Sequence, residues 1–174
     1  MSRGQKRGLL VSFSGLPGVG KSSIARMLAA EIAAIWLRID SIESAIRASS
    51  VVEGDMKDAG YRAAYAVAAD NLALGHRVIA DCVNPWMLTR DAWRNVAFAA
   101  DAELLEVEIV CTDRDAHRNR VETRRSAANN CAGPTWQEVV ERDYRPWIRP
   151  VGIVETAERE VGDCAAEIRH MLAL

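Results

Sequence analysis

The sequence has 174 residues, a formal net charge of −2 and a pI near 6.0, with 49% hydrophobic and 26% charged residues. These are the values of an ordinary globular protein, and they exclude disordered, collagen-like and coiled-coil chains. The length fits one domain with its own core, so we expect residues 1–174 to form a single domain. The slightly acidic balance argues against binding nucleic acid through bulk charge, and we expect no such partner.

The chain has no apolar run that approaches the length of about 20 residues needed to span a membrane. Its first apolar run is too short for a secretory leader, and its four cysteines form no C-x-x-C pair. We therefore expect a cytoplasmic protein that does not contact membranes and whose cysteines are reduced.

Short apolar runs alternate with longer stretches of helical periodicity along the whole chain. The predicted strands cover 9–13, 36–39, 77–80, 104–110 and 151–154, and the predicted helices cover 21–35, 41–48, 57–74, 88–100, 113–127, 135–143 and 160–172. This alternation implies parallel strands joined by right-handed crossovers, with helices on both faces. We predict a doubly wound α/β fold, in which ligands bind at the carboxyl ends of the strands.

A glycine-rich loop directly follows the first predicted strand. It reads Gly15-Leu16-Pro17-Gly18-Val19-Gly20-Lys21-Ser22, which is the pattern G-x-x-x-x-G-K-S, and a helix follows it. Glycine permits the backbone angles that turn the loop's N–H groups inward around a phosphate. Lys21 then reaches the β- and γ-phosphates and the Ser22 hydroxyl binds Mg²⁺, with Ser23 beside them. The loop predicts a binding site for a nucleoside triphosphate, with ATP as the expected nucleotide.

Two aspartates lie at the predicted carboxyl ends of strands. Asp81 follows the third strand, where it is expected to anchor Mg²⁺, although it could instead cap the next turn. Asp40 follows the second strand, where it could take the proton of an acceptor hydroxyl or merely cap the next helix. Cys82 stands after Asp81 where motor ATPases commonly have a glutamate, and the chain has no N-K-x-D motif. These features favour phosphoryl transfer to a bound acceptor over a hydrolase or a GTPase switch.

Further candidates are arginines and one tryptophan. Arg120 and Arg124 lie four residues apart in an arginine-rich helix, hence on one face, where they could clamp a phosphoryl group or simply form a solvated face. Arg47 could reach the acceptor or remain a solvated charge, and Trp86 could form a wall of the acceptor pocket. Arg90 stands at a helix start, where a cation fits the dipole badly, which hints at an anionic partner.

Together these features resemble the small P-loop kinases of the AAA_33 type, the group of zeta-toxin and chloramphenicol phosphotransferase. The residues that carry the resemblance are the loop 15–22, Asp40, the run 78–81, the helix 117–125 and Pro134-Thr135-Trp136. The resemblance implies a three-layer fold like that of nucleoside monophosphate kinases, with a five-stranded parallel sheet in the order 2-3-1-4-5. It also implies ATP and Mg²⁺, Asp40 as the general base, and lid arginines that match Arg120 and Arg124, with a probable lid around 124–135. Thr156, after the last strand, matches the region that passes the adenine.

The sequence thus predicts an ATP-dependent kinase that phosphorylates a hydroxyl of a small molecule, such as an antibiotic, a sugar or a nucleoside. Acceptors in the group also include polynucleotide ends, so a polynucleotide 5′-kinase stays as an alternative. A nucleotide-binding ATPase or regulator without a transfer substrate is the other.

Overall fold

The computed structural model describes residues 7–50, 54, 56–127 and 133–174. Its centre is a sheet of five parallel strands in the order β2-β3-β1-β4-β5. The strands are β1 (Leu9–Ser14), β2 (Ile35–Arg38), β3 (Arg77–Asp81), β4 (Glu103–Val110) and β5 (Gly152–Glu155). The strand order and the α/β class agree with the sequence prediction.

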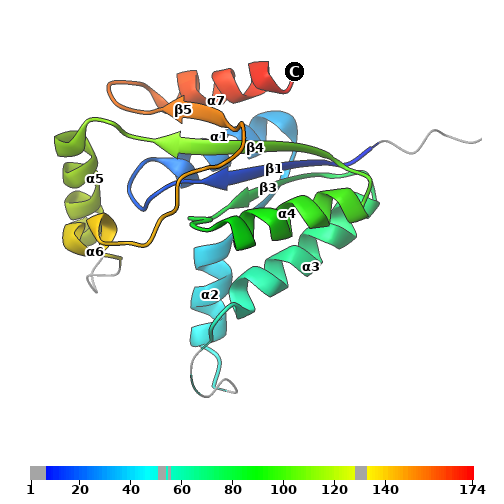
Figure 1. The fold of residues 1–174 in the computed structure, drawn as a ribbon, viewed down its shortest axis with the longest axis horizontal. Helices are drawn as coiled ribbons and strands as arrows, with labels where there is room; N and C mark the ends of the chain where they lie inside the picture. Colours follow the sequence, from blue (N-terminus) through cyan, green and yellow to red (C-terminus); the bar gives the residue numbers. More distant parts are fainter. Residues whose placement is uncertain (1–6, 51–53, 55, 128–132) are drawn as a thin grey trace, which may run out of the picture.

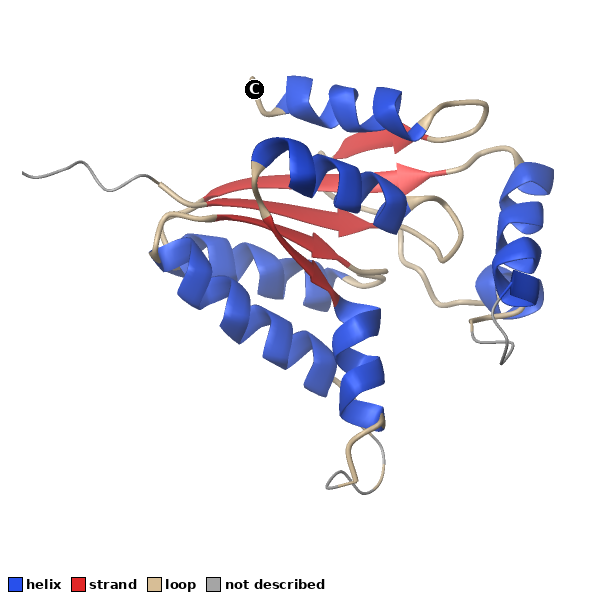
Figure 2. Ribbon diagram, turned by 180° about the vertical axis from the view of Figure 1, so that it is seen from behind, coloured by secondary structure: helices blue, strands red, loops and turns tan. Residues whose placement is uncertain are grey.

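Helices cover both faces of the sheet, which gives three layers (Figure 1). They are α1 (Lys21–Ile32), α2 (Ile39–Arg47), α3 (Ala59–Ala73), α4 (Met87–Ala99), α5 (Arg114–Ala127), α6 (Trp136–Val140) and α7 (Val161–Met171). Helices α1 and α7 pack together on one face, and α3 and α4 on the other. Figure 2 shows α5 and α6 standing beyond the carboxyl ends of the strands.

The alternation of side chains along β1 explains the two core layers. Every residue of β1 is buried, as expected for a central parallel strand. Val11 and Phe13 point into the core under α1 and α7, whereas Leu10 points into the core under α3 and α4. Because side chains alternate with a period of two, one apolar strand holds both helical layers on the sheet.

The structure shifts several predicted boundaries. Helix α1 ends at Ile32 because Ala33 takes a left-handed conformation (φ 51°), which turns the chain into β2. Helix α2 begins at Ile39, so Asp40 lies in its first turn rather than at the end of the strand. These shifts of one to three residues leave the order of elements unchanged.

The predicted helix over 135–143 is wrong in length. Helix α6 begins behind Thr135, which forms a capping box with Glu138, and it ends at Val140. The chain then runs without regular structure from 141 to 151, a segment that we call the strap. Among the described residues, no helix combines the length and the apolar character that crossing a membrane requires.

Candidate active site

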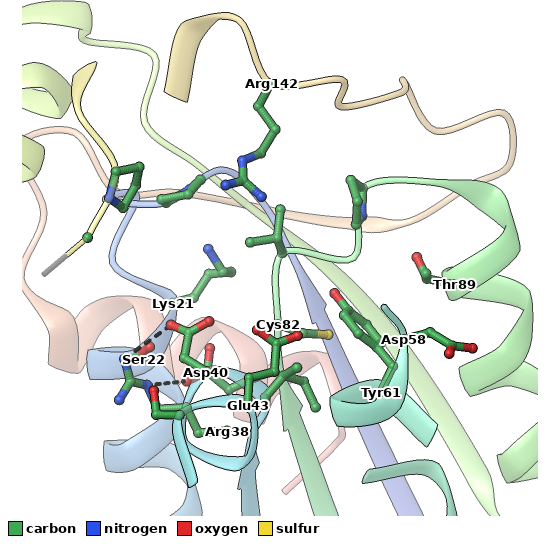
Figure 3. Close-up of a pocket in the computed structure, with 18 of the residues that line it drawn as sticks. Lys21, Ser22, Arg38, Asp40, Glu43, Asp58, Tyr61, Cys82, Thr89 and Arg142 are labelled. Carbon is green, nitrogen blue, oxygen red and sulfur yellow. Dashed lines mark hydrogen bonds and ion pairs between the residues drawn. The ribbon is translucent and has the colours of Figure 1, made fainter. Parts of the chain in front are cut away.

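An open cavity of about 1570 Å³ lies at the carboxyl edge of the sheet. The glycine-rich loop and the start of α1 form one side, and α2, the start of α3 and the loop after β3 form the other. Figure 3 shows the side chains that enter this space, with Lys21 near its centre. The cavity thus occupies the place where the α/β fold predicts a ligand.

The glycine-rich loop has the backbone that phosphate binding requires. Gly15 and Gly20 have φ of 135° and 102°, in the region that favours glycine, and a Cβ on Gly15 would collide with the carbonyl oxygen of Ile109. Gly20 also precedes the first residue of α1, so the loop leads into a helix N-terminus. On the outer side of the loop, the His117 ring contacts the Pro17 carbonyl oxygen through Nε2 at 2.8 Å.

Lys21 is buried, with 7% of its surface exposed, and its Nζ donates to the Leu16 carbonyl oxygen at 2.8 Å. Burial lowers the pKa of Lys21 to about 8, although the charges of Asp81 and Asp40 oppose this shift. The Lys21 ammonium group therefore lies inside the glycine-rich loop, where the charges of Asp81 and Asp40 act on it.

Ser22 and Asp81 meet at the start of α1 and the end of β3. The Asp81 side chain is 3% exposed, accepts a hydrogen bond from Trp36 Nε1 at 3.2 Å, and also bonds the Ser22 side chain. Burial raises the pKa of Asp81, while these hydrogen bonds and the Lys21 charge lower it. These oxygens suit Mg²⁺, and no group of three or more His, Cys, Asp or Glu within the described ranges could hold a metal ion alone. Nucleotide phosphates and water would have to complete the coordination.

Asp40 faces the cavity from the first turn of α2, next to Glu43 (Figure 3). Its side chain is 59% exposed, and Arg38 Nη2 donates to its Oδ2 at 3.2 Å. Arg38 Nε lies 4.0 Å from Asp81 Oδ2, so one guanidinium stands between the two carboxylates. Asp40 is thus held in place and still open to an acceptor.

The predicted arginines of the basic helix divide into two kinds. Arg124 is exposed and lines the cavity. Arg120 borders the cavity as well, but its guanidinium donates to Thr156 Oγ1 at 2.9 Å and to the Thr156 carbonyl oxygen at 2.8 Å. Thr156 is 4% exposed, and its hydroxyl bonds the Val19 carbonyl oxygen. Thr156 therefore links α5 to the back of the glycine-rich loop and is not part of the cavity lining.

Trp86 and Arg47, two of the predicted substrate residues, both reach the cavity. Trp86 lines the cavity, and its Nε1 donates to Asp143 Oδ2 at 3.1 Å. Arg47 lines the cavity as well, with an ion pair to Glu43 at 3.0 Å. Of the predicted lid at 124–135, residues 128–132 lie outside the described residues.

The prediction for Arg90 is wrong. Arg90 is completely buried and lies outside the cavity lining. Its guanidinium donates to backbone carbonyl oxygens and lies over two aromatic rings; the carbonyls belong to Asn84, Pro85, Arg145 and Pro146, and the rings to Tyr144 and Trp147. These partners satisfy the cation that looked misplaced at a helix start.

Several cavity residues escaped the sequence reasoning, among them Arg38, Glu43, Asp58, Tyr61, Thr89 and Arg142. Tyr61 accepts a hydrogen bond from the Asn84 N–H at 3.1 Å, and burial raises its pKa. The position of Tyr61 at the start of a helix near the carboxyl edge was the only signal for it. Arg142 had no local signal, because its place depends on how the strap folds back.

The sequence model of the AAA_33 family, an AAA domain, matches residues 10–142. No curated protein matches the chain. Among solved structures, the APS kinase CysC of Mycobacterium tuberculosis in complex with AMPPNP and APS has a TM-score of 0.75 and 23% identity, over 97% of this chain and 99% of that chain.

Two further structures show the same similarity. A putative kinase from Chloroflexus aurantiacus has a TM-score of 0.75 and 17% identity, over 95% of this chain and 98% of that chain. A gluconokinase from Sinorhizobium meliloti has a TM-score of 0.60 and 20% identity, over 98% and 94%. At these identities the likeness shows a shared fold, the P-loop nucleotide-binding fold.

Proposed function

The chain belongs to the AAA_33 family, and from this premise we propose that it is an ATP-dependent kinase that phosphorylates a hydroxyl of a small molecule. One observation carries the proposal: the phosphate-binding loop with Lys21 and the exposed carboxylate of Asp40 open into the same cavity. The structures it resembles include an APS kinase and a gluconokinase, which act on small molecules. We place the reaction in the cytoplasm.

In the proposed reaction the chain positions its two substrates and moves one proton. The loop N–H groups and Lys21 hold the β- and γ-phosphates of ATP. Ser22 and Asp81 would hold Mg²⁺, which neutralises the phosphate charge. Asp40 accepts the proton of the acceptor hydroxyl. The hydroxyl oxygen bonds the γ-phosphorus while the bond from that phosphorus to the bridging oxygen breaks, so that ADP leaves.

Four Asp and Glu side chains stand among the eight Lys and Arg side chains in the described lining of the cavity, and this interruption leads us to prefer a small acceptor over a polynucleotide. The acceptor side carries basic residues such as Arg47 and Arg62, but also Glu43 and Asp58. A polynucleotide groove needs a continuous basic surface along the backbone, and the carboxylates interrupt it here. We therefore do not propose a polynucleotide as the acceptor, and oligonucleotides serve only as one class of test acceptor in the experiment below.

The first prediction concerns Asp40. Asp40→Asn removes the proton acceptor but keeps the size and the neighbours of the side chain. General bases contribute about 100-fold to 10,000-fold, so we expect kcat to fall at least about 100-fold while ATP affinity stays within about threefold. Labelled ATP is offered with sugars, nucleosides, aminoglycosides and oligonucleotides, and transfer is measured by product label.

Asp70→Asn is the matched control, because Asp70 is an exposed aspartate near the end of α3 and does not line the cavity. This variant should transfer the phosphoryl group at the wild-type rate. Full transfer by Asp40→Asn would remove Asp40 from the role of base. ATP binding without transfer to any acceptor would instead favour a nucleotide-binding regulator.

A further inference from the structure

Arg142 stands at the start of the strap and points its guanidinium into the cavity (Figure 3). Within the described part of the chain, this guanidinium makes no hydrogen bond or ion pair, and its charge acts on the nearby Glu138 carboxylate, whose pKa it helps the hydrogen bonds from Thr135 to lower. Among the described residues, three of the other five arginines that line the cavity are paired, Arg38 with Asp40, Arg47 with Glu43 and Arg120 with Thr156. An arginine that is held in a cavity without a partner can take up an anion.

Arg142 lines the same cavity as Lys21 and Asp40. The half with the glycine-rich loop includes Lys21, and the other half includes Asp40 at the start of α2. In Figure 3 Arg142 comes down from the side opposite Asp40, toward the space that Lys21 borders. In the proposed reaction, the phosphoryl group moves from ATP at the loop toward an acceptor beside Asp40, through the cavity that Arg142 also lines.

Hydrogen bonds hold the strap just after Arg142, and they fix the backbone from which its exposed side chain extends. Trp86 Nε1 donates to Asp143 Oδ2 at 3.1 Å, and the Arg145 N–H donates to the Pro85 carbonyl oxygen at 2.8 Å. Arg90 Nη2 donates to the Arg145 carbonyl oxygen at 2.8 Å. Farther along, Trp147 Nε1 donates to Ser14 Oγ at 3.2 Å, next to the glycine-rich loop. These bonds tie the strap to the end of β1 and to the loop that follows β3.

We propose that Arg142 binds the terminal phosphate of the nucleoside triphosphate, and that the loop carrying Lys21 and the strap carrying Arg142 enclose this phosphate from two sides. The inference rests on the proposed function only in taking the nucleotide to be a triphosphate held by the loop. The sequence assigned a phosphate contact to Arg120 and Arg124; the Arg120 guanidinium is bound to Thr156, whereas Arg124 lines the cavity, so Arg142 adds a contact from the strap. The planar guanidinium can bind two phosphate oxygens at once.

The test compares AMPPNP with ADP, both with Mg²⁺, by calorimetry. For Arg142→Ala we expect AMPPNP affinity to fall about tenfold, the size of one hydrogen bond to a charged group, while ADP affinity stays within about twofold. Arg142→Lys should lose less AMPPNP affinity than Arg142→Ala, because lysine keeps the positive charge although it cannot bind two phosphate oxygens at once. Arg145→Ala, whose exposed guanidinium pairs with Asp143 in the same strap, should bind both nucleotides as the wild type does.

An equal loss for AMPPNP and ADP, or no loss for either, would overturn the assignment to the terminal phosphate. The experiment contains no acceptor, so its result is independent of whether transfer occurs. A wild-type protein that fails to phosphorylate any acceptor would defeat the proposed kinase activity, and a tenfold effect of Arg142→Ala would still stand.

Discussion

At the scale of single residues, Lys21 combines a buried position with a charge that the proposed function needs. Burial lowers its pKa to about 8, so in the free protein a substantial part of Lys21 is neutral at pH 8. A bound triphosphate favours the charged form and raises the pKa again. Nucleotide binding and protonation of Lys21 are therefore coupled.

This coupling gives a prediction for the pH dependence of binding. Below pH 7 Lys21 is charged before and after binding, and affinity does not depend on it. Above pH 8 binding must first protonate the amine, so we expect affinity to fall by up to about tenfold for each pH unit. Calorimetry at pH 8.5 in buffers of different ionisation enthalpy should show net proton uptake with ADP and Mg²⁺.

Lys21→Arg serves as the control, because a guanidinium stays charged throughout this range. The uptake should disappear in this variant even where its affinity is lower. If the wild type and Lys21→Arg took up the same number of protons, another group would be responsible and the pKa of Lys21 would not be the cause.

At the scale of elements, one buried side chain makes several of the bonds that hold the strap. Arg90 belongs to α4, and its guanidinium bonds carbonyl oxygens of the loop 84–85 and of the strap at 145–146. These carbonyls lie up to 56 residues away in sequence. The ring of Trp147 lies under the guanidinium, 4.3 Å from its carbon to the ring centroid. The strap has no regular structure of its own, and these bonds attach its 145–147 part to α4.

We expect Arg90→Met to lower the free energy of unfolding by about 3 kcal/mol, because the variant leaves several buried carbonyl oxygens without a donor. Arg94→Met on the same helix removes a half-exposed cation and should cost less than about 1 kcal/mol, since Glu106 keeps its bonds to Arg149. Urea unfolding measures the free energy of unfolding of both variants and of the wild type. Equal costs for the two variants would mean that the carbonyl contacts of Arg90 contribute no more than a surface ion pair.

At the scale of the whole molecule, the sequence predicted what local patterns and the rules of parallel sheets determine. The loop 15–22 was found because its spacing alone requires a particular backbone. Asp40 and Asp81 were placed at one edge because parallel strands end there together. The strand order came from the family resemblance.

What the sequence could not predict depends on contacts between distant segments. Arg90 was misread because its partners lie on a strap that has no periodic pattern. The length of α6 was overestimated, since the strap is fixed by tertiary hydrogen bonds rather than by helix propensity. Arg142 and Tyr61 reach the cavity only through the path of the folded chain, so no motif revealed them.

The cavity draws on α1, α2, α3, α5 and the strap, so a ligand that fills it should stabilise the whole fold. At a concentration of ADP and Mg²⁺ of about 100 times Kd, linkage adds about 2.7 kcal/mol to the free energy of unfolding. For a chain of this size we expect Tm to rise by roughly 5–10 °C, measured by thermal unfolding. Lys21→Ala should show little of this rise. AMP lacks the β-phosphate that the loop binds and should leave Tm nearly unchanged at the same concentration; an equal rise with AMP would mean that the base and ribose, rather than the loop, provide the binding energy.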